Sequence, residues 1–568
     1  MKFKKHLISV FLACSLFFTG CGKWSIPTNA NTAFQNFTHC FFQQEVASNT
    51  INLHYSLQNP DAYGITEIPI SLGSYDMDET ATLVSIENWE ASLRKFSYYS
   101  LSKENRLTYD ILSHYFSSLK EGVSYYLYNE PLSPITGIHA QLPVLLAEYQ
   151  FLSNEDVDTY LQLLETTPNY FASLIRFQEQ KSSAGLFMSD ATADAVMEQC
   201  KAFLAMGEEN YLLSTFEERL NNVTELSPKE RVEYIKQNHT VVFNSVIPAY
   251  ETLALSLDKL KGTGKTDLGV CSLPDGQAFY SYLIGSETGS SRTIEELKTL
   301  IANQISTDLL DLQQVLLENP SILEEADSIT DSPENILKSL KTKISDAFPT
   351  PASVDVNIKY VPTALQKYLS PAFYLIPAID GFEENTIYIN EAYNMDHISL
   401  FTTLAHEGYP GHLYQTTYFA NQSPDPIRTL LTYSGYVEGW ATYAEMCSYY
   451  ISPLEKAHAR FLQKNNSLIL GLYAMADIGI HYDVWTLAQT IEFFSQYGIS
   501  DQATVQEIYQ YIVGDPANYV TYYVGYLEIL ELKKWYMGKK GDSFSQKDFH
   551  QKVLEIGPAP FEIIKKYM

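Results

Sequence analysis

Two histidines and a glutamate lie close together in residues 406–412, which read HEGYPGH. Imidazole nitrogens and carboxylate oxygens are common ligands of Zn²⁺, so His406, Glu407 and His412 point to metal chemistry. The usual zinc-peptidase pattern is H-E-x-x-H on a helix, with the second histidine at i+4. Here His412 follows His406 by six residues. On a regular helix that spacing turns the two side chains about 240° apart, so they would not meet at one ion.

The residues between the two histidines predict a break in the helix. Pro410 lacks the N–H that would bond to the carbonyl of His406, and its ring clashes there. Gly408 and Gly411 can take backbone angles that other residues avoid. A bulge of two extra residues would return His412 to the His406 face, and bulges in helices are often found at functional sites. The alternative is a helix that ends in a Pro-Gly turn and carries two histidines by chance.

A second predicted helix, residues 432–450, carries acidic side chains that could complete a metal site. Glu438 and Glu445 are seven residues apart and so share one helix face. A catalytic zinc has about three protein ligands and one open position for water. Glu438 is the candidate third ligand, and Glu407 is the candidate base that takes a proton from the water. This would be the two-histidine, one-glutamate arrangement of thermolysin-type peptidases.

Most of the chain that must position these residues reads as helix. Apolar residues recur at three- and four-residue steps in four long stretches, 86–119, 157–180, 190–206 and 293–319. Thr293 and Glu296 form a predicted capping box. Alternating or β-type residues predict three strands, at 354–360, 372–379 and 385–392. After residue 396 the pattern returns to helix. We therefore expect a mainly α protein with a small β-sheet immediately before HEGYPGH.

The N-terminus resembles a lipoprotein signal peptide. Residues 1–20 contain three lysines, then the apolar run LISVFLACSLFF, and end in Thr-Gly before Cys21. The apolar run of 12 residues is too short to span a bilayer as a mature helix. We expect Cys21 to be lipidated, so that the protein is exported, anchored to the cell membrane and faces outward. An ordinary secretory signal is the alternative. Residues 21–45 are predicted to form a polar tether.

The net charge bears on which partners the protein binds, and the cysteine content bears on disulfides. The net charge of −29 argues against nucleic-acid binding, because such a surface repels phosphate backbones. Cleavage after residue 20 would remove three lysines and change the net charge to −32. The mature chain would keep four cysteines besides Cys21 and no C-x-x-C pair, so no disulfide framework is defined.

Several sequence blocks resemble one bacterial family. They are HEGYPGH, VEGWATYAE (437–445), DIGIH (477–481), NYVTYYVGYLEILELKKW and FSQKDFHQKVLEIGPAPFEIIKKYM. These blocks are similar to bacterial domain-of-unknown-function family 885, and the resemblance runs from about residue 60 to the end. That family is similar to gluzincin metallopeptidases, whose third ligand is a glutamate on the helix after the H-E helix. The resemblance implies a gluzincin-like zinc peptidase fold, mainly α with a small β-sheet, in which helical halves flank a deep cleft.

The resemblance also implies roles for individual residues. The ligands of Zn²⁺ would be His406, His412 and Glu438, the base would be Glu407, and Glu445 would orient a histidine ligand.

Two further residues, His481 and Tyr522, lie where such peptidases place a donor to the oxyanion. The plain alternatives are a buried core histidine and one more of the 42 tyrosines. The chain departs from the family pattern at Tyr473, where arginine is usual, and at GDPANYVTYY (514–523), where P-G-Q-A is usual. Contacts with substrate are therefore left open.

The predicted organisation has four parts. They are a lipoprotein signal peptide (1–20), a polar tether (21–45), a helical N-terminal part (46–350) and a metallopeptidase-like part with the sheet and the zinc-site helices (351–568). The expected function is zinc-dependent hydrolysis of peptide bonds in short peptides at the cell surface. The strand NTIYINEA (385–392) is a candidate to pair with an extended peptide substrate. Two alternatives stay open: a zinc amidase acting on cell-wall peptides, and a non-enzymatic surface lipoprotein that binds a solute or a partner.

Overall fold

The computed structural model describes residues 29–66, 68–264, 268–324, 331–361, 363, 366 and 369–568. The predicted signal peptide and Cys21 lie outside these residues. The chain divides into two compact units, Met1–Ser97 with Leu119–Asp267, and Tyr98–Ser118 with Leu268–Met568. The boundary predicted at residue 350 falls instead at 267. The long helix α14 (Ile294–Glu318) explains the difference, because it packs along α20 (Lys456–His481) in the second unit.

The second half of the predicted polar tether is a helix, so the tether prediction is wrong for those residues. α2 (Ala30–Val46) begins after Asn29, whose side chain accepts a hydrogen bond from the amide of Asn31. Its phenylalanines at 34, 37, 41 and 42 are buried, and their three- and four-residue spacing makes one apolar helix face. Two of them pack on Trp89 of α4 (Glu79–Leu93), with ring centroids 5.6 and 4.9 Å away. The polar residues on the opposite face of the helix led to the prediction of a tether.

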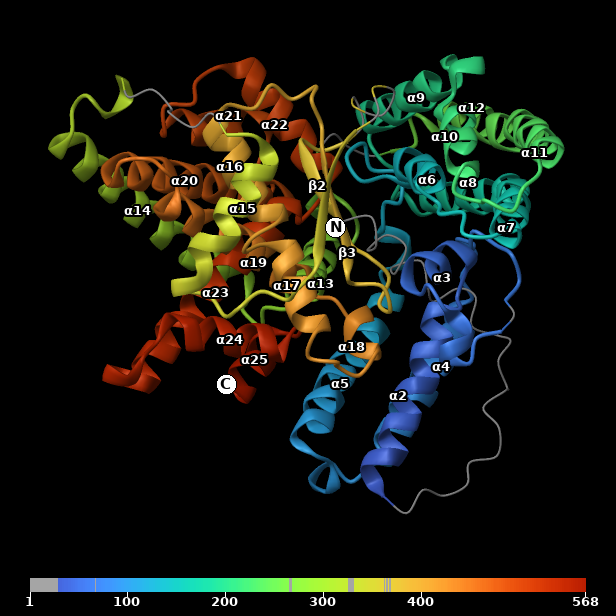
Figure 1. Cartoon of the computed structure of the whole chain (residues 1–568). Helices are drawn as coiled ribbons and strands as arrows, with labels where there is room; N and C mark the ends of the chain where they lie inside the picture. The colour runs from blue at the N-terminus through green and yellow to red at the C-terminus, as the bar shows by residue number, and fades with distance from the viewer. Residues whose placement is uncertain are drawn as a thin grey trace. The chain divides into compact units, whose positions relative to one another are not determined.

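The first unit is otherwise helical (Figure 1). Its further helices are α3 (Thr50–Ser56), α6 (Ile138–Ala147), α7 (Asn154–Glu165), α8 (Thr167–Ala184), α9 (Asp190–Ala205), α10 (Tyr211–Leu220), α11 (Pro228–Val241) and α12 (Ile247–Leu260). A π-turn, Val242–Val246, joins α11 to α12 just before Pro248. The turn is consistent with a proline that lacks the N–H a regular helix needs. α12 packs on α8 and α9.

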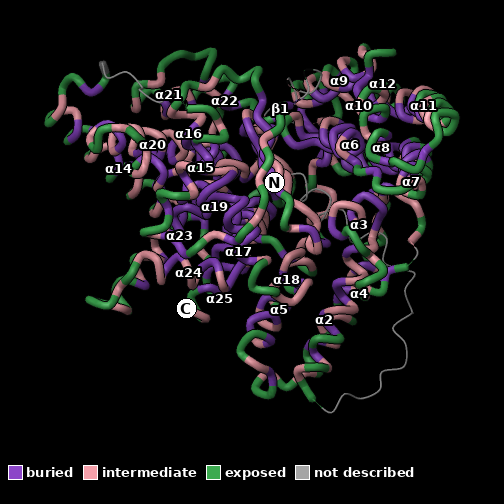
Figure 2. Tube along the Cα trace, viewed as in Figure 1, coloured by how far each residue is buried: buried purple, intermediate pink, exposed green. Residues whose placement is uncertain are grey.

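The second unit holds the sheet and the remaining helices. In chain order these are α5 (Lys103–Val123, up to residue 118), α13 (Gly276–Thr288), α14, α15 (Pro333–Lys343), α16 (His397–Glu407), α17 (His412–Ala420), α18 (Ile427–Leu430), α19 (Ser434–Ser448), α20, α21 (Leu487–Ser495), α22 (Gln502–Gly514), α23 (Asn518–Lys540), α24 (Gln546–Ile556) and α25 (Phe561–Tyr567). The predicted return to helix after residue 396 is confirmed. The capping box that starts α14 is also confirmed, with Thr293 N donating to Glu296 and Glu296 N donating to Thr293. α19 is buried along almost its whole length and forms the centre of this unit (Figure 2).

A buried ion pair joins α14 to α20. The Asp308 carboxylate has no exposed surface and lies 2.9 Å from the Lys464 ammonium. Its other oxygen accepts a 2.6 Å hydrogen bond from the Ser467 hydroxyl. The pair links the two helices, and removing one partner would leave a charge without compensation in the interior.

His550 makes a second buried polar link, from α24 to α19. One ring nitrogen, Nδ1, donates to the carbonyl of Ala347 at 2.8 Å, and Nε2 accepts from the Tyr443 hydroxyl at 2.9 Å. The ring stacks on Phe348 with centroids 4.0 Å apart. Burial lowers the pKa of His550 to about 3, so the fold requires the neutral ring.

The small sheet has three strands, as predicted. β1 (Asp355–Tyr360) lies parallel to β3 (Glu384–Ile389), and β2 (Ala372–Leu375) lies antiparallel to it, in the order β1-β3-β2. The predicted second strand is shorter in the structure and ends before Pro377, a residue that suits a strand end at a sheet edge. Because β3 is paired on both sides, the prediction that NTIYINEA adds a peptide strand is wrong. β2 forms one outer edge of the described sheet.

The backbone N–H and C=O groups of β2 point alternately toward its partner β3 and toward that outer edge. Asn390 N donates to Pro371 O at 2.8 Å, and the register pairs Phe373 with Tyr388. Hydrogen-bonded positions alternate along an antiparallel ladder. The backbone groups of Ala372 and Tyr374 therefore point away from β3, toward α16, which packs on β2.

Candidate metal centre

The helix that carries His406 breaks after Glu407 and resumes at His412. Gly411 N donates to Ala405 O at 2.9 Å, and Tyr414 N donates to Gly408 O at 3.2 Å. Each of these hydrogen bonds spans six residues, whereas the hydrogen bonds of a regular α-helix span four. This is the predicted bulge of two extra residues.

Close contacts hold the bulge in place and explain its glycines. A Cβ on Gly411 would overlap the carbonyl oxygen of His406, and one on Gly408 would lie 2.5 Å from Leu337. The indole N–H of Trp440 on α19 donates to the carbonyl of Pro410 at 2.8 Å. A carbonyl that the broken helix leaves without an intrahelical partner is thereby satisfied.

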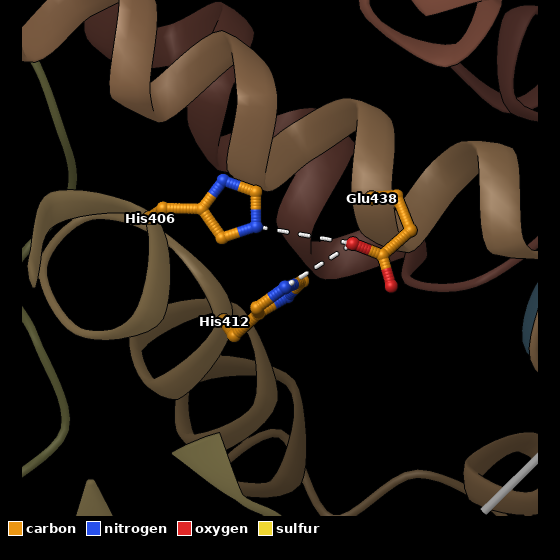
Figure 3. Close-up of side chains that lie close together, drawn as sticks. All are labelled: His406, His412 and Glu438. Atoms are coloured by element: carbon orange, nitrogen blue, oxygen red, sulfur yellow. Dashed lines mark ion pairs between the residues drawn. The ribbon is translucent and has the colours of Figure 1, made fainter. Parts of the chain in front are cut away.

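The bulge brings three predicted residues together. His406 Nε2 and His412 Nε2 lie 3.8 and 3.4 Å from the same oxygen of Glu438 (Figure 3). The candidate ligand atoms of the three residues all lie within 4.8 Å of one another, and the two rings stand at 83°. His412 and Glu438 are buried. The alternative, in which His412 faces away on a continuous turn, does not hold.

The cluster is electrostatically coupled. Burial alone would lower the pKa of His406, but its contacts with Glu438 and Glu445 and the nearby charge of Glu407 outweigh burial and raise the pKa to about 10. Burial alone would raise the pKa of Glu438, but the two histidines hold it well below its usual range. Glu438 therefore stays ionised, and a proton on His406 is favoured beside it.

Glu445 lies against the far side of His406. Its Oε2 is 3.1 Å from His406 Nδ1, and its Oε1 accepts a 2.9 Å hydrogen bond from the side-chain amide of Asn466 on α20. A carboxylate at Nδ1 holds a proton on that nitrogen, which leaves Nε2 as the ring atom directed at Glu438 and His412. Asn466 carries no signal in the sequence, since it belongs to no motif and lies 21 residues away.

Glu407 lies between the cluster and the sheet. Its Oε2 accepts a 2.8 Å hydrogen bond from the backbone N–H of Tyr374, one of the β2 groups that points away from β3. The Tyr374 hydroxyl donates to Asn385 of β3 at 2.5 Å, so the residue is held from both ends. Sequence patterns did not predict this contact, because it depends on how the sheet packs against α16.

Tyr522 on α23 also belongs to the cluster. Its ring stacks on His406 with centroids 6.4 Å apart at 27°. Burial, followed by the charges of Glu438 and Glu407 and a hydrogen bond to Glu438, raises the pKa of Tyr522 well above its usual value. The phenol therefore keeps its proton and can act as a donor.

His481 does not have the predicted catalytic geometry. It is completely buried, its Nδ1 accepts from Val270 N at 3.1 Å, and its Nε2 donates to Ile512 O at 2.8 Å. Both ring nitrogens are thus held by backbone groups. Burial also lowers the pKa of His481 to about 4. The residue ties the end of α20 to the end of α22, so it is the buried core histidine of the plain alternative.

Glycines allow α19 and α23 to approach closely enough to bring Tyr522 to Glu438. A Cβ on Gly525 would overlap the carbonyl oxygen of Gly435 and lie 2.8 Å from the Cα of Gly439. Gly435 and Gly439 flank Glu438 on α19, and Gly525 follows Tyr522 by three residues on α23. The helices therefore cross backbone to backbone beside the cluster.

All these residues lie within one family match. The model of a family described as "Bacterial protein of unknown function (DUF885)" matches residues 75–568. The chain belongs to this family. The DUF885 match covers every residue of the candidate centre and most of both compact units. A comparison with curated proteins gave no match.

Solved structures share the DUF885 chain's fold over nearly its whole length. One, of a predicted lipoprotein from Colwellia psychrerythraea, has 19% identity and a TM-score of 0.79, covering 95% of this chain and 99% of its own. Another, of a predicted lipoprotein of unknown function from Shewanella oneidensis, has 17% identity and a TM-score of 0.64, covering 94% and 98%. At these identities the likeness establishes the mainly helical fold with its small sheet.

Proposed function

We propose that this DUF885 protein is a zinc-dependent metallopeptidase that hydrolyses peptide bonds in short peptides at the cell surface. The observation that carries the proposal is the convergence of His406, His412 and Glu438, with Glu407 beside them at the edge of β2. The six-residue spacing of the histidines, which first argued against a metal site, supports one once the bulge is taken into account.

The donor set fits Zn²⁺. Zinc takes nitrogen and carboxylate ligands at about 2.0–2.2 Å in tetrahedral sites, which separates neighbouring ligand atoms by about 3.3 Å. The two histidine nitrogens lie 3.8 and 3.4 Å from the Glu438 oxygen, so small side-chain rotations would suffice. Three protein ligands would leave one position for water, as catalytic zinc sites require.

The remaining side chains have matching roles. A bound Zn²⁺ would polarise the scissile carbonyl and lower the pKa of its water. In this proposal Glu407, which has one carboxylate oxygen held by the Tyr374 amide, would accept the proton from that water through its other oxygen. Tyr522 keeps its proton and would donate to the substrate oxygen on which negative charge develops.

We place the enzyme at the cell envelope, attached through a lipid on Cys21 and facing outward. The lipoprotein-like N-terminus supports this location, and two proteins of the same fold are described as lipoproteins.

The proposal is tested with the soluble fragment 22–568, which lacks the signal peptide and Cys21. The wild type should contain one zinc per chain by elemental analysis, His406→Ala should lose it, and His397→Ala should retain it. His397 is the matched control because it lies on the same helix, exposed and away from the cluster.

Activity is measured on a peptide library. Glu407→Gln should keep zinc and lose about 10²–10⁴-fold in rate, the usual contribution of a general base. A wild type without stoichiometric zinc would overturn the proposal in favour of a non-enzymatic binder. Full activity of Glu407→Gln would overturn the mechanism. Cleavage of cell-wall peptides alone would identify the amidase alternative.

A further inference from the structure

Three helices contribute to holding His406, and one of the side chains involved, Asn466, belongs to none of the motifs above. His406 on α16 contacts Glu445 on α19, and Glu445 contacts Asn466 on α20. Each oxygen of Glu445 has one partner: Oε2 meets His406 Nδ1 at 3.1 Å, and Oε1 meets the Asn466 amide at 2.9 Å. The geometry of the carboxylate is thus fixed at both ends.

Glu445 needs such a partner because burial does not hold it. Its side chain is 20% exposed, whereas that of Glu438 is 5% exposed. A partly exposed glutamate can exchange its contact with a histidine for contacts with water. In this structure the rotamer of Glu445 that meets His406 has its second oxygen bound by Asn466.

The chemistry of an amide suits this task. The Asn466 NH₂ group donates a hydrogen bond without carrying charge. A lysine or arginine in its place would form an ion pair with Glu445 and compete with His406 for the carboxylate. An amide orients Glu445 and leaves its negative charge directed at His406.

We propose that Asn466 is a positioning residue, which holds Glu445 against His406 Nδ1 and so keeps His406 Nε2 directed at His412 and Glu438. The expected effect on Zn²⁺ affinity rests on the proposed function. Residues that orient a metal ligand from behind typically change metal affinity by about 10–100-fold when they are replaced.

The test compares three variants of the soluble fragment 22–568. Asn466→Ala removes the donor, and Asn466→Asp removes it while keeping the size of the side chain. Asn465→Ala is the matched control, since Asn465 is the same residue type at the preceding position of α20 and, among the described contacts, makes no side-chain hydrogen bond to the cluster.

The first readout is a crystal structure of each metal-free variant, which does not depend on zinc. In both Asn466 variants the Glu445 carboxylate should leave hydrogen-bonding distance of His406 Nδ1, and in Asn465→Ala it should stay. A Glu445 that stays on His406 in both Asn466 variants would overturn the proposal. The proposal also fails if Glu445 leaves His406 in Asn466→Ala but stays in Asn466→Asp, because packing and not the amide donor would then hold the carboxylate.

The second readout is Zn²⁺ affinity, measured by competition with a chelator. Both Asn466 variants should bind Zn²⁺ about 10–100-fold more weakly, and Asn465→Ala should stay within about twofold of the wild type. Wild-type affinity in the Asn466 variants would overturn the positioning role. Absence of Zn²⁺ binding by the wild type would instead refute the proposed function, and the crystal structures would still decide whether Asn466 holds Glu445.

Discussion

Replacement of Gly411 by alanine tests whether the bulge sets the metal centre. The added Cβ would overlap the carbonyl oxygen of His406 and lie 2.5 Å from that of Ala405. Both neighbours are backbone atoms, so no side-chain rotation can relieve the contact. The start of α17 must move away from α16, and His412, the next residue, moves with it.

The cost can be divided into two terms. Forcing a carbon into a closed space costs about 1–3 kcal/mol, and more when backbone must shift. Loss of the 2.9 Å bond from Gly411 N to Ala405 O adds about 1 kcal/mol. We expect the free energy of unfolding of the metal-free protein to fall by about 2–4 kcal/mol. Because metal–ligand distances tolerate only about ±0.2 Å, a shifted His412 should also weaken Zn²⁺ binding by about 100-fold or more.

Urea unfolding of metal-free protein and chelator competition for Zn²⁺ measure the two effects separately. The control is Gly538→Ala on α23, where a Cβ would meet nothing within 4 Å. Alanine is the better helix former there, so Gly538→Ala should be neutral or stabilise by up to about 1 kcal/mol. If Gly411→Ala binds Zn²⁺ within twofold of the wild type, the bulge does not position His412 and the reasoning is refuted.

Three further predictions concern packing and pH. Gly525→Ala should drive α23 off α19, lower stability by about 1–3 kcal/mol and reduce the proposed peptidase activity, whereas Gly538→Ala on the same helix should have none of these effects. Lys464→Met should destabilise by about 3–5 kcal/mol in denaturant melts, because the buried charge of Asp308 loses the cation that balances it, and adding Asp308→Asn should recover part of the loss. His550 has its pKa lowered to about 3, so its contribution to stability is complete above pH 6.5 and is lost as pH falls from 6.5 toward 3. By pH 4.5 the loss should reach about 2–3 kcal/mol, and His550→Gln should flatten the stability profile between pH 6.5 and 4.5; an unchanged slope would exclude this residue as its source.

The parts of the site that sequence could predict depend on local rules. Proline at 410 between two glycines indicated a broken helix, and the seven-residue spacing of Glu438 and Glu445 placed both on one face. The short sheet before the motif followed from alternation. These features need only neighbouring residues, and the structure reproduces them.

The parts that could not be predicted depend on tertiary packing. Asn466 and the backbone N–H of Tyr374 reach the site only because α20 and β2 pack where they do. Histidine often serves as a catalytic donor, but both ring nitrogens of His481 are hydrogen-bonded to backbone groups. No local pattern distinguishes a histidine held in the core from one that faces a substrate.

The bulge also changes how the motif should be counted. Gly411 takes the hydrogen-bonding position that the residue at 409 would take in an unbroken helix, because its amide bonds to Ala405 across two surplus residues. Counted in hydrogen-bond steps, His412 is therefore four steps from His406, the separation of the histidines in H-E-x-x-H. Patterns that look incompatible by residue number can thus share one helical phase. A search for such sites should score helical phase and allow surplus residues wherever glycine and proline can absorb them.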